Sequence, residues 1–110
     1  MTTVTFFYEN DKVVKVSACG HSGNAESGKD IVCAAVSTLV QTAYLAIADI
    51  TPDVVYKRDD DNAEFEFSVK ADCSVRHDVD VILRALTVGL NDLEHGYPKH
   101  IKTEVKRNVY

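Results

Sequence analysis

The fold of this chain is decided by IVCAAVSTLVQTAYLAIADI, the stretch from Ile31 to Ile50. Its apolar residues recur at three- and four-residue spacing, which is typical of one face of an amphipathic helix. Thr51 and Pro52 follow, and the residue before a proline disfavours helical geometry. The sequence therefore predicts one long helix whose apolar face is made by Ile31, Val32, Ala35, Val36, Leu39, Ala43, Ala46, Ile47 and Ile50.

Segments rich in β-formers on both sides of this helix predict two hairpins. Before the helix, VTFFY and KVVKVSAC flank the turn-forming residues 9–11. After it, VVYKR and AEFEFSVK flank the polar turn DDDN. In the second of these, Phe65, Phe67 and Val69 alternate with polar residues, which indicates a half-exposed strand.

A second helix and a last strand complete the expected fold. Apolar residues repeat at helical spacing from about Asp78 to His95, and Gly96 with Pro98 supplies the stop. The tail IKTEVKRNVY alternates as a strand. We therefore predict one α+β domain over residues 1–110 in the order ββαββαβ. The expected architecture is a two-layer α/β sandwich, a mostly antiparallel sheet with both helices on one face.

Composition excludes several classes of protein. Twelve Lys and Arg against 17 Asp and Glu give a net charge of −5, which argues against direct nucleic-acid binding through a blanket of basic side chains. We expect no membrane span, because we find no apolar run that approaches the roughly 18 residues a span requires, and the opening MTTVTFFYEN has no signal-peptide pattern. Three cysteines without a CxxC pair indicate free thiols in a reducing compartment, so a cytoplasmic location is expected.

The informative segment for chemistry is GHSGNAESGKDIVCAAVS, Gly20 to Ser37. Three of the five glycines of the chain, Gly20, Gly23 and Gly28, lie in its first half, which predicts a mobile loop. His21 precedes Cys33 by twelve positions, so a folded-back loop could bring an imidazole to the thiol. The spacing alone does not show that the two side chains meet.

Helix geometry puts Asp30, Cys33, Ser37 and Gln41 within a sector of roughly 80°, away from the centre of the apolar face. A thiol in that sector would face a loop or cleft. If Asp30 is the N-cap, Cys33 lies in the first turn, where unpaired amides stabilise a thiolate. If Ser27 is the cap, with Asp30 completing a capping box, Cys33 lies deeper and gains less.

A metal site is the competing chemistry at this place. Cys19, His21 and Cys33, with Cys73 as a fourth ligand, could hold zinc, but their spacing is unlike that of paired-Cys zinc sites. His77, His95 and His100 show no HxxxH or HExxH spacing and are interpreted as surface residues. We therefore expect no metal and no cofactor.

The combined pattern of Gly20, His21, Gly28, Asp30, Ile31, Val32, Cys33, Ala34 and Ser37 closely resembles the Prp family of ribosomal-processing cysteine proteases. The resemblance implies a homodimeric peptidase that removes a short N-terminal extension from a large-subunit ribosomal protein, the bacterial twenty-seventh. It implies Cys33 as nucleophile and His21 as general base, with Asp30, Ser37 and Gly20 in supporting roles. It also implies substrates with a hydrophobic, Phe-containing segment before the cut. With such a peptide as substrate, we expect the mobile loop from Gly20 to Gly28 to close on the bound peptide. The alternative is a non-catalytic ribosome-assembly or ribosomal-protein-binding module.

Overall fold

The computed structural model describes residues 1–20 and 27–108, with residues 27–30 described by their backbone alone. The elements follow one another in the predicted order ββαββαβ. They are β1 (Thr2–Glu9), β2 (Lys12–Cys19), α1 (Ser27–Ile50), β3 (Val55–Asp59), β4 (Glu64–Ser68), α2 (Arg76–Gly96) and β5 (Ile101–Arg107).

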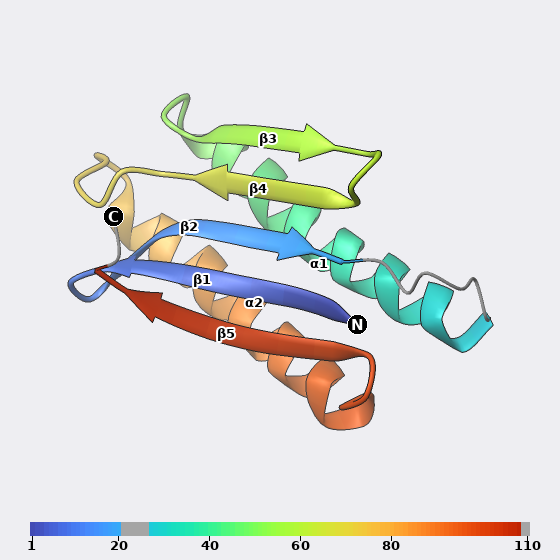
Figure 1. Ribbon diagram of the computed structural model, residues 1–110. Helices are drawn as coiled ribbons and strands as arrows, with labels where there is room; N and C mark the ends of the chain where they lie inside the picture. The colour runs from blue at the N-terminus through green and yellow to red at the C-terminus, as the bar shows by residue number, and fades with distance from the viewer. Residues whose placement is uncertain (21–26, 109–110) are drawn as a thin grey trace.

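The strands form one five-stranded sheet in the order β3-β4-β2-β1-β5 (Figure 1). Both hairpins are antiparallel, as predicted, and β2 also pairs with β4 in antiparallel fashion, whereas β5 pairs with β1 in parallel and places Thr2 opposite Ile101. This direction follows from the connection: β4 runs parallel to β1, and α2 carries the chain across the sheet to return it in the direction of β4. The start of β1 therefore lies inside the sheet, between β2 and β5.

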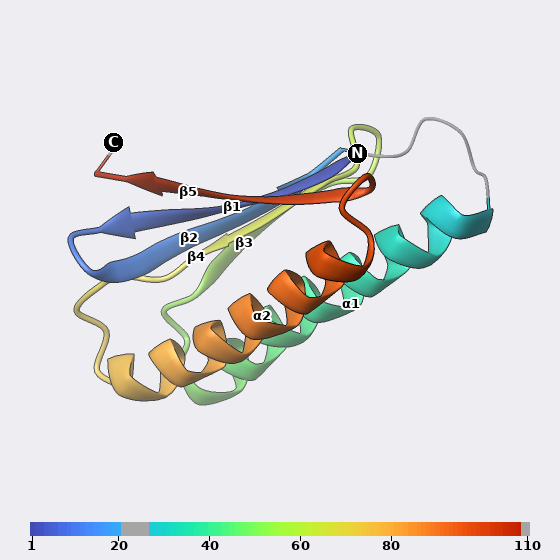
Figure 2. The same cartoon turned by 90° about the horizontal axis from the view of Figure 1, so that it is seen from below.

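Both helices cover the same face of the sheet, and their axes run side by side beneath it (Figure 2). The core lies between the two layers. It is built from alternate strand residues and from one stripe of each helix: Val4, Phe6, Val16, Phe67, Val32, Val36, Val40, Ala43, Ile47, Val79, Leu83, Leu86 and Leu90. The two-layer α+β sandwich expected from the sequence is confirmed.

Helix α1 differs from its prediction at its N-terminal end. It begins at Ser27, four residues before Ile31, so Gly28 lies in its first turn and not in the preceding loop. Asp30 is also within the helix, which makes the assignment of Asp30 as N-cap wrong. The buried stripe is narrower than predicted: Ile31 is 62% exposed and Ile50 37%, while Val40, absent from the predicted face, is buried.

The expectation that no apolar run reaches the length of a membrane span is also wrong. Residues 31–50 have a mean hydropathy of 1.9 and are long and apolar enough to cross a membrane, by length and composition only. In the structure 28% of that window is buried, and its buried stripe packs in the core between sheet and helices. A core helix passes the same test, so the length of this run is weak evidence for a span.

A buried arginine fixes the start of α2 to the sheet. The Arg76 guanidinium donates hydrogen bonds to the backbone carbonyls of Val13 and Lys70 and to the Asp80 carboxylate, 2.7 Å from its Nε. Lys12 Nζ reaches the other oxygen of Asp80 at 3.1 Å. Burial alone would raise the pKa of Asp80, but the hydrogen bonds from Lys12 and Arg76 outweigh it and lower that pKa below its usual value.

Because the pKa of Asp80 is lower in the folded state, its contribution to stability is present at neutral pH. It is lost as pH falls below about 4 through the folded-state value. We expect Asp80→Asn to reduce the loss of unfolding free energy between pH 6 and pH 3, measured by urea titration. Asp92→Asn, at an exposed position of the same helix, is the control and should keep the full loss. Equal losses in both variants would contradict this assignment.

Candidate active site

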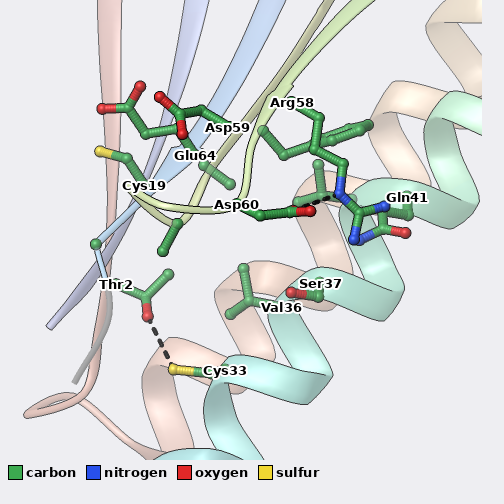
Figure 3. Close-up of a pocket in the computed structure, with 15 residues that line it drawn as sticks. Thr2, Cys19, Cys33, Val36, Ser37, Gln41, Arg58, Asp59, Asp60 and Glu64 are labelled. Carbon is green, nitrogen blue, oxygen red and sulfur yellow. Dashed lines mark hydrogen bonds and ion pairs between the residues drawn. The ribbon is translucent and has the colours of Figure 1, made fainter. Parts of the chain in front are cut away.

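A cleft of about 280 Å³ opens where the start of β1 and the end of β2 face helix α1 (Figure 3). The turn between β3 and β4 closes its far side. The residues that line it come from β1, β2, α1 and the second hairpin: Thr2, Ala18, Cys19, Gly20, Cys33, Val36, Ser37, Val40, Gln41, Arg58, Asp59, Asp60, Ala63, Glu64 and Phe65.

Cys33 lies at one end of this cleft, on the face of α1 that is turned toward the start of β1 (Figure 3). Its side chain is half-buried, and its sulfur lies 3.5 Å from the Thr2 hydroxyl oxygen. Cys33 is the seventh residue of the helix, beyond the first four residues whose amides lack helical partners. Since the electrostatic field of a helix end falls off within the first turn, the N-terminus of α1 contributes little to stabilising a thiolate at this sulfur.

Ser37 and Gln41 follow Cys33 at intervals of one turn and line the same cleft. The structure thus brings together three of the four residues that helix geometry assigned to one sector. The side chain of Asp30 lies outside the described part of the chain, as do His21 and Gly23. The pairing of His21 with Cys33, the roles of Asp30 and Ser37, and the closing of the loop therefore stay predictions.

Gly20 has a specific structural reason to be glycine. Its φ is +97°, a backbone conformation that L side chains rarely adopt. A Cβ at this position would lie 2.5 Å from the carbonyl oxygen of Met1 and 3.6 Å from Thr2 Cα. Gly20 therefore lets the chain that leaves β2 pass directly against the backbone of Met1 and Thr2. The hydroxyl of this Thr2 is the group that contacts Cys33.

The middle of the cleft is apolar and its far rim is charged. Ala18, Val36, Val40 and Phe65 supply the apolar wall, and Tyr44 lies behind it with its ring centroid 5.9 Å from that of Phe65. At the rim, Arg58 Nε lies 2.7 Å from an Asp60 carboxylate oxygen. Hydrogen bonds from the Asn62 side chain and backbone lower the pKa of Asp59.

Sequence reasoning missed both Thr2 and the second hairpin as parts of this site. Their contribution depends on strand pairing, which puts Glu64 opposite Cys19 and Phe65 opposite Ala18. The one available signal was the alternation of Phe65 and Phe67, which showed that one face of β4 would be buried. It did not show which strand β4 would join.

The other two cysteines are separated from Cys33. The side chain of Cys19 points away from α1 (Figure 3). Cys73 is 8% exposed and belongs to the core, in the β4–α2 connection at the opposite end of the sheet (Figure 1). Cys73 therefore cannot be the fourth ligand of the competing zinc site, and the described residues contain no cluster of three His, Cys, Asp or Glu side chains that could hold a metal.

Comparisons with known proteins identify the family of this chain. Residues 1–102 match the family model described as cysteine protease Prp. The chain is 31% identical over 101 residues to a Staphylococcus aureus protein named ribosomal processing cysteine protease Prp, covering 89% of this chain and 92% of that one. A Bacillus subtilis protein of the same name is 26% identical over 106 residues, covering 93% and 95% of the two chains.

Solved structures share the whole fold. SMU.848 from Streptococcus mutans superposes with a TM-score of 0.87 at 25% identity, covering 98% of this chain and 96% of that chain. The protease Prp from S. aureus in complex with a substrate peptide gives a TM-score of 0.85 at 27% identity, covering 96% and 100%. With a family match over nearly its full length and a half-buried cysteine in a cleft, this chain belongs to the Prp family of ribosomal-processing cysteine proteases.

Proposed function

We propose that this cysteine protease removes a short N-terminal extension from the bacterial twenty-seventh large-subunit ribosomal protein, with Cys33 as nucleophile and His21 as general base. The observation that carries the proposal is the position of the Cys33 sulfur, half-buried at one end of a cleft with an apolar wall beside it. The S. aureus relative is named a ribosomal processing protease and was solved with a substrate peptide. Those names support the substrate class.

In the proposed reaction the Cys33 thiolate attacks the carbonyl carbon of the scissile peptide bond. His21 takes the thiol proton and then gives it to the leaving amine. The products of this first half are the free amine of the mature ribosomal protein and a thioester between Cys33 Sγ and the extension. His21 next activates a water molecule, which hydrolyses the thioester and restores the thiol.

The cleft suits a hydrophobic segment before the cut. Val36 follows Cys33 by three residues on α1, so the apolar wall begins beside the sulfur. A side chain next to the scissile bond would lie against Val36, Val40 and Phe65. The net charge of −5 favours encounter with a basic ribosomal protein. A ribosomal substrate and three free cysteines support a cytoplasmic location.

The homodimer implied by the resemblance is also a proposal. Large apolar side chains are exposed on the helices: Leu45 on α1 is 62% exposed, and Val81 and Val88, two turns apart on α2, are 56% and 60% exposed. No helix or strand of the described residues covers the helical layer on the side away from the sheet (Figure 2). Sedimentation should give twice the mass of one chain, and Val88→Glu should lower that mass. A wild-type protein that sediments as one chain would contradict the proposal.

The test of the function is cleavage of the extended ribosomal protein, followed by mass spectrometry of the intact product. The wild-type chain should yield a shortened protein and a released N-terminal peptide. Cys19→Ala is the matched control, because this side chain points away from α1, and it should still cut. Binding of the ribosomal protein without any shortened product would favour the non-catalytic binding module instead.

A further inference from the structure

We propose that Thr2 is a positioning residue for the nucleophile, and that its hydroxyl stabilises the Cys33 thiolate. The proposal rests on the proposed function of Cys33. Thr2 Oγ1 lies 3.5 Å from Cys33 Sγ, across 31 positions of sequence. Among the side chains of residues 1–20 and 31–108, it is the hydrogen-bond partner that the structure gives to this sulfur. Thr2 is 6% exposed, so water competes little for its hydroxyl.

Two separate segments hold the backbone of Thr2 in place. Its backbone amide donates a hydrogen bond to the carbonyl of His100 at 2.9 Å, and it pairs with Ile101 in the parallel register of β5. Gly20 packs against the Met1–Thr2 backbone from the other side. The sheet therefore fixes the Thr2 backbone on both sides, so the hydroxyl reaches the Cys33 sulfur from an anchored point.

The hydroxyl can serve both protonation states of Cys33. A threonine hydroxyl is both donor and acceptor and rotates to suit its partner. It can accept a hydrogen bond from the neutral thiol and, after the thiol proton has left to the general base, donate its own hydrogen to the thiolate. Thr2 keeps its proton throughout. A hydrogen bond donated to a thiolate favours the charged form. Cys33 lies beyond the first turn of α1, so the free amides at the helix start do not supply such a hydrogen bond.

Other charged or titratable groups of the cleft lie across it, at the end of β2 and on the β3–β4 hairpin. They are Cys19, Arg58, Asp59, Asp60 and Glu64. The structure shows no hydrogen bond or ion pair from any of these five side chains to Thr2 or to the Cys33 sulfur, and Figure 3 shows them toward the side of the cleft away from Cys33. A substitution at Thr2 leaves all of them in place, so it isolates the contribution of the hydroxyl.

The experiment is the pH profile of alkylation at Cys33 by iodoacetamide, followed by mass spectrometry of the peptide that contains Cys33. Thr2→Val removes the hydroxyl and keeps the shape of the side chain. Its alkylation midpoint should rise by about one pH unit. Thr2→Ser should restore the wild-type profile. Thr5→Val makes the same change in the same strand at a residue that is 8% exposed, and should leave the midpoint unchanged.

A Thr2→Val midpoint equal to that of the wild type would overturn the proposal. Circular dichroism should verify folding; if Thr2→Val does not fold, Thr2→Ala carries the same expected rise. The alkylation assay needs no substrate, so it tests Thr2 even if the ribosomal protein is not cut. Conversely, cleavage by the wild type with an unchanged Thr2→Val profile rejects the role of Thr2 and leaves the proposed protease function intact.

Discussion

Cys33→Ala is expected to lower kcat/KM for cleavage of the extended ribosomal protein by at least about 10³-fold. The loss is large because the thiolate forms the covalent intermediate, and an alanine methyl group cannot do so. Stability should change little, because Cys33 is half-buried on the cleft side of α1 while the core stripe passes through Val32 and Val36. Steady-state kinetics with a thermal unfolding scan checks both parts.

Ser37→Ala is the comparison within the same cleft. Ser37 lies one turn beyond Cys33 and is exposed. A supporting hydrogen bond to the substrate contributes on the order of 1 kcal/mol, so this substitution should lower kcat/KM by about tenfold or less. Equal losses from Cys33→Ala and Ser37→Ala would mean that the two side chains act as a unit, which the proposed dyad does not predict.

Gly20→Ala is expected to destabilise the fold by about 1–3 kcal/mol and to slow alkylation of Cys33 as well. Alanine resists the φ of +97°, and its Cβ would lie 2.5 Å from the Met1 carbonyl oxygen. Relief requires the Met1–Thr2 backbone to move, and the hydroxyl of Thr2 moves with it. Urea unfolding measures the first effect, and alkylation at neutral pH measures the second.

Gly96→Ala provides the matched control. Gly96 is the last residue of α2, and a Cβ there would meet nothing within 4 Å. Alanine is favoured over glycine in a helix, so this variant should be as stable as the wild type or slightly more so. If Gly20→Ala also left the free energy of unfolding unchanged, the close approach of Gly20 to the start of β1 would not contribute to stability, contrary to this prediction.

The sequence was sufficient for the architecture because the relevant patterns are local. Local backbone geometry alone sets the period of two residues in a strand and of 3.6 residues in a helix. These periods are visible in the alternation of Phe65 and Phe67 and in the spacing of Val79, Leu83, Leu86 and Leu90. The parallel pairing of β5 with β1 was not predicted, since partner strands are chosen by burial of the whole sheet. The exposure of Ile31 has a similar cause, because the sheet covers only the stripe centred on Val36 and Val40.

The candidate site was predicted in part. Cys33, Ser37 and Gln41 share one side of α1 because helix geometry fixes their angles, and this required no tertiary information. Thr2 and Arg58 could not be predicted, since they reach the cleft only through strands that pair across long stretches of sequence, β1 with β5 and β2 with β4. The start of α1 was ambiguous because Ser27 and Asp30 are both good capping residues.

The most direct test of the central claim is to find the covalent intermediate. Cleavage of the extended ribosomal protein is stopped with acid during turnover, and the protease is digested and analysed by mass spectrometry. The peptide that contains Cys33 should carry the added mass of the removed extension, linked as a thioester, and Cys33→Ala should yield neither adduct nor product. Continued cleavage by Cys33→Ala, with the extension released and never attached to the chain, would contradict Cys33 as the nucleophile.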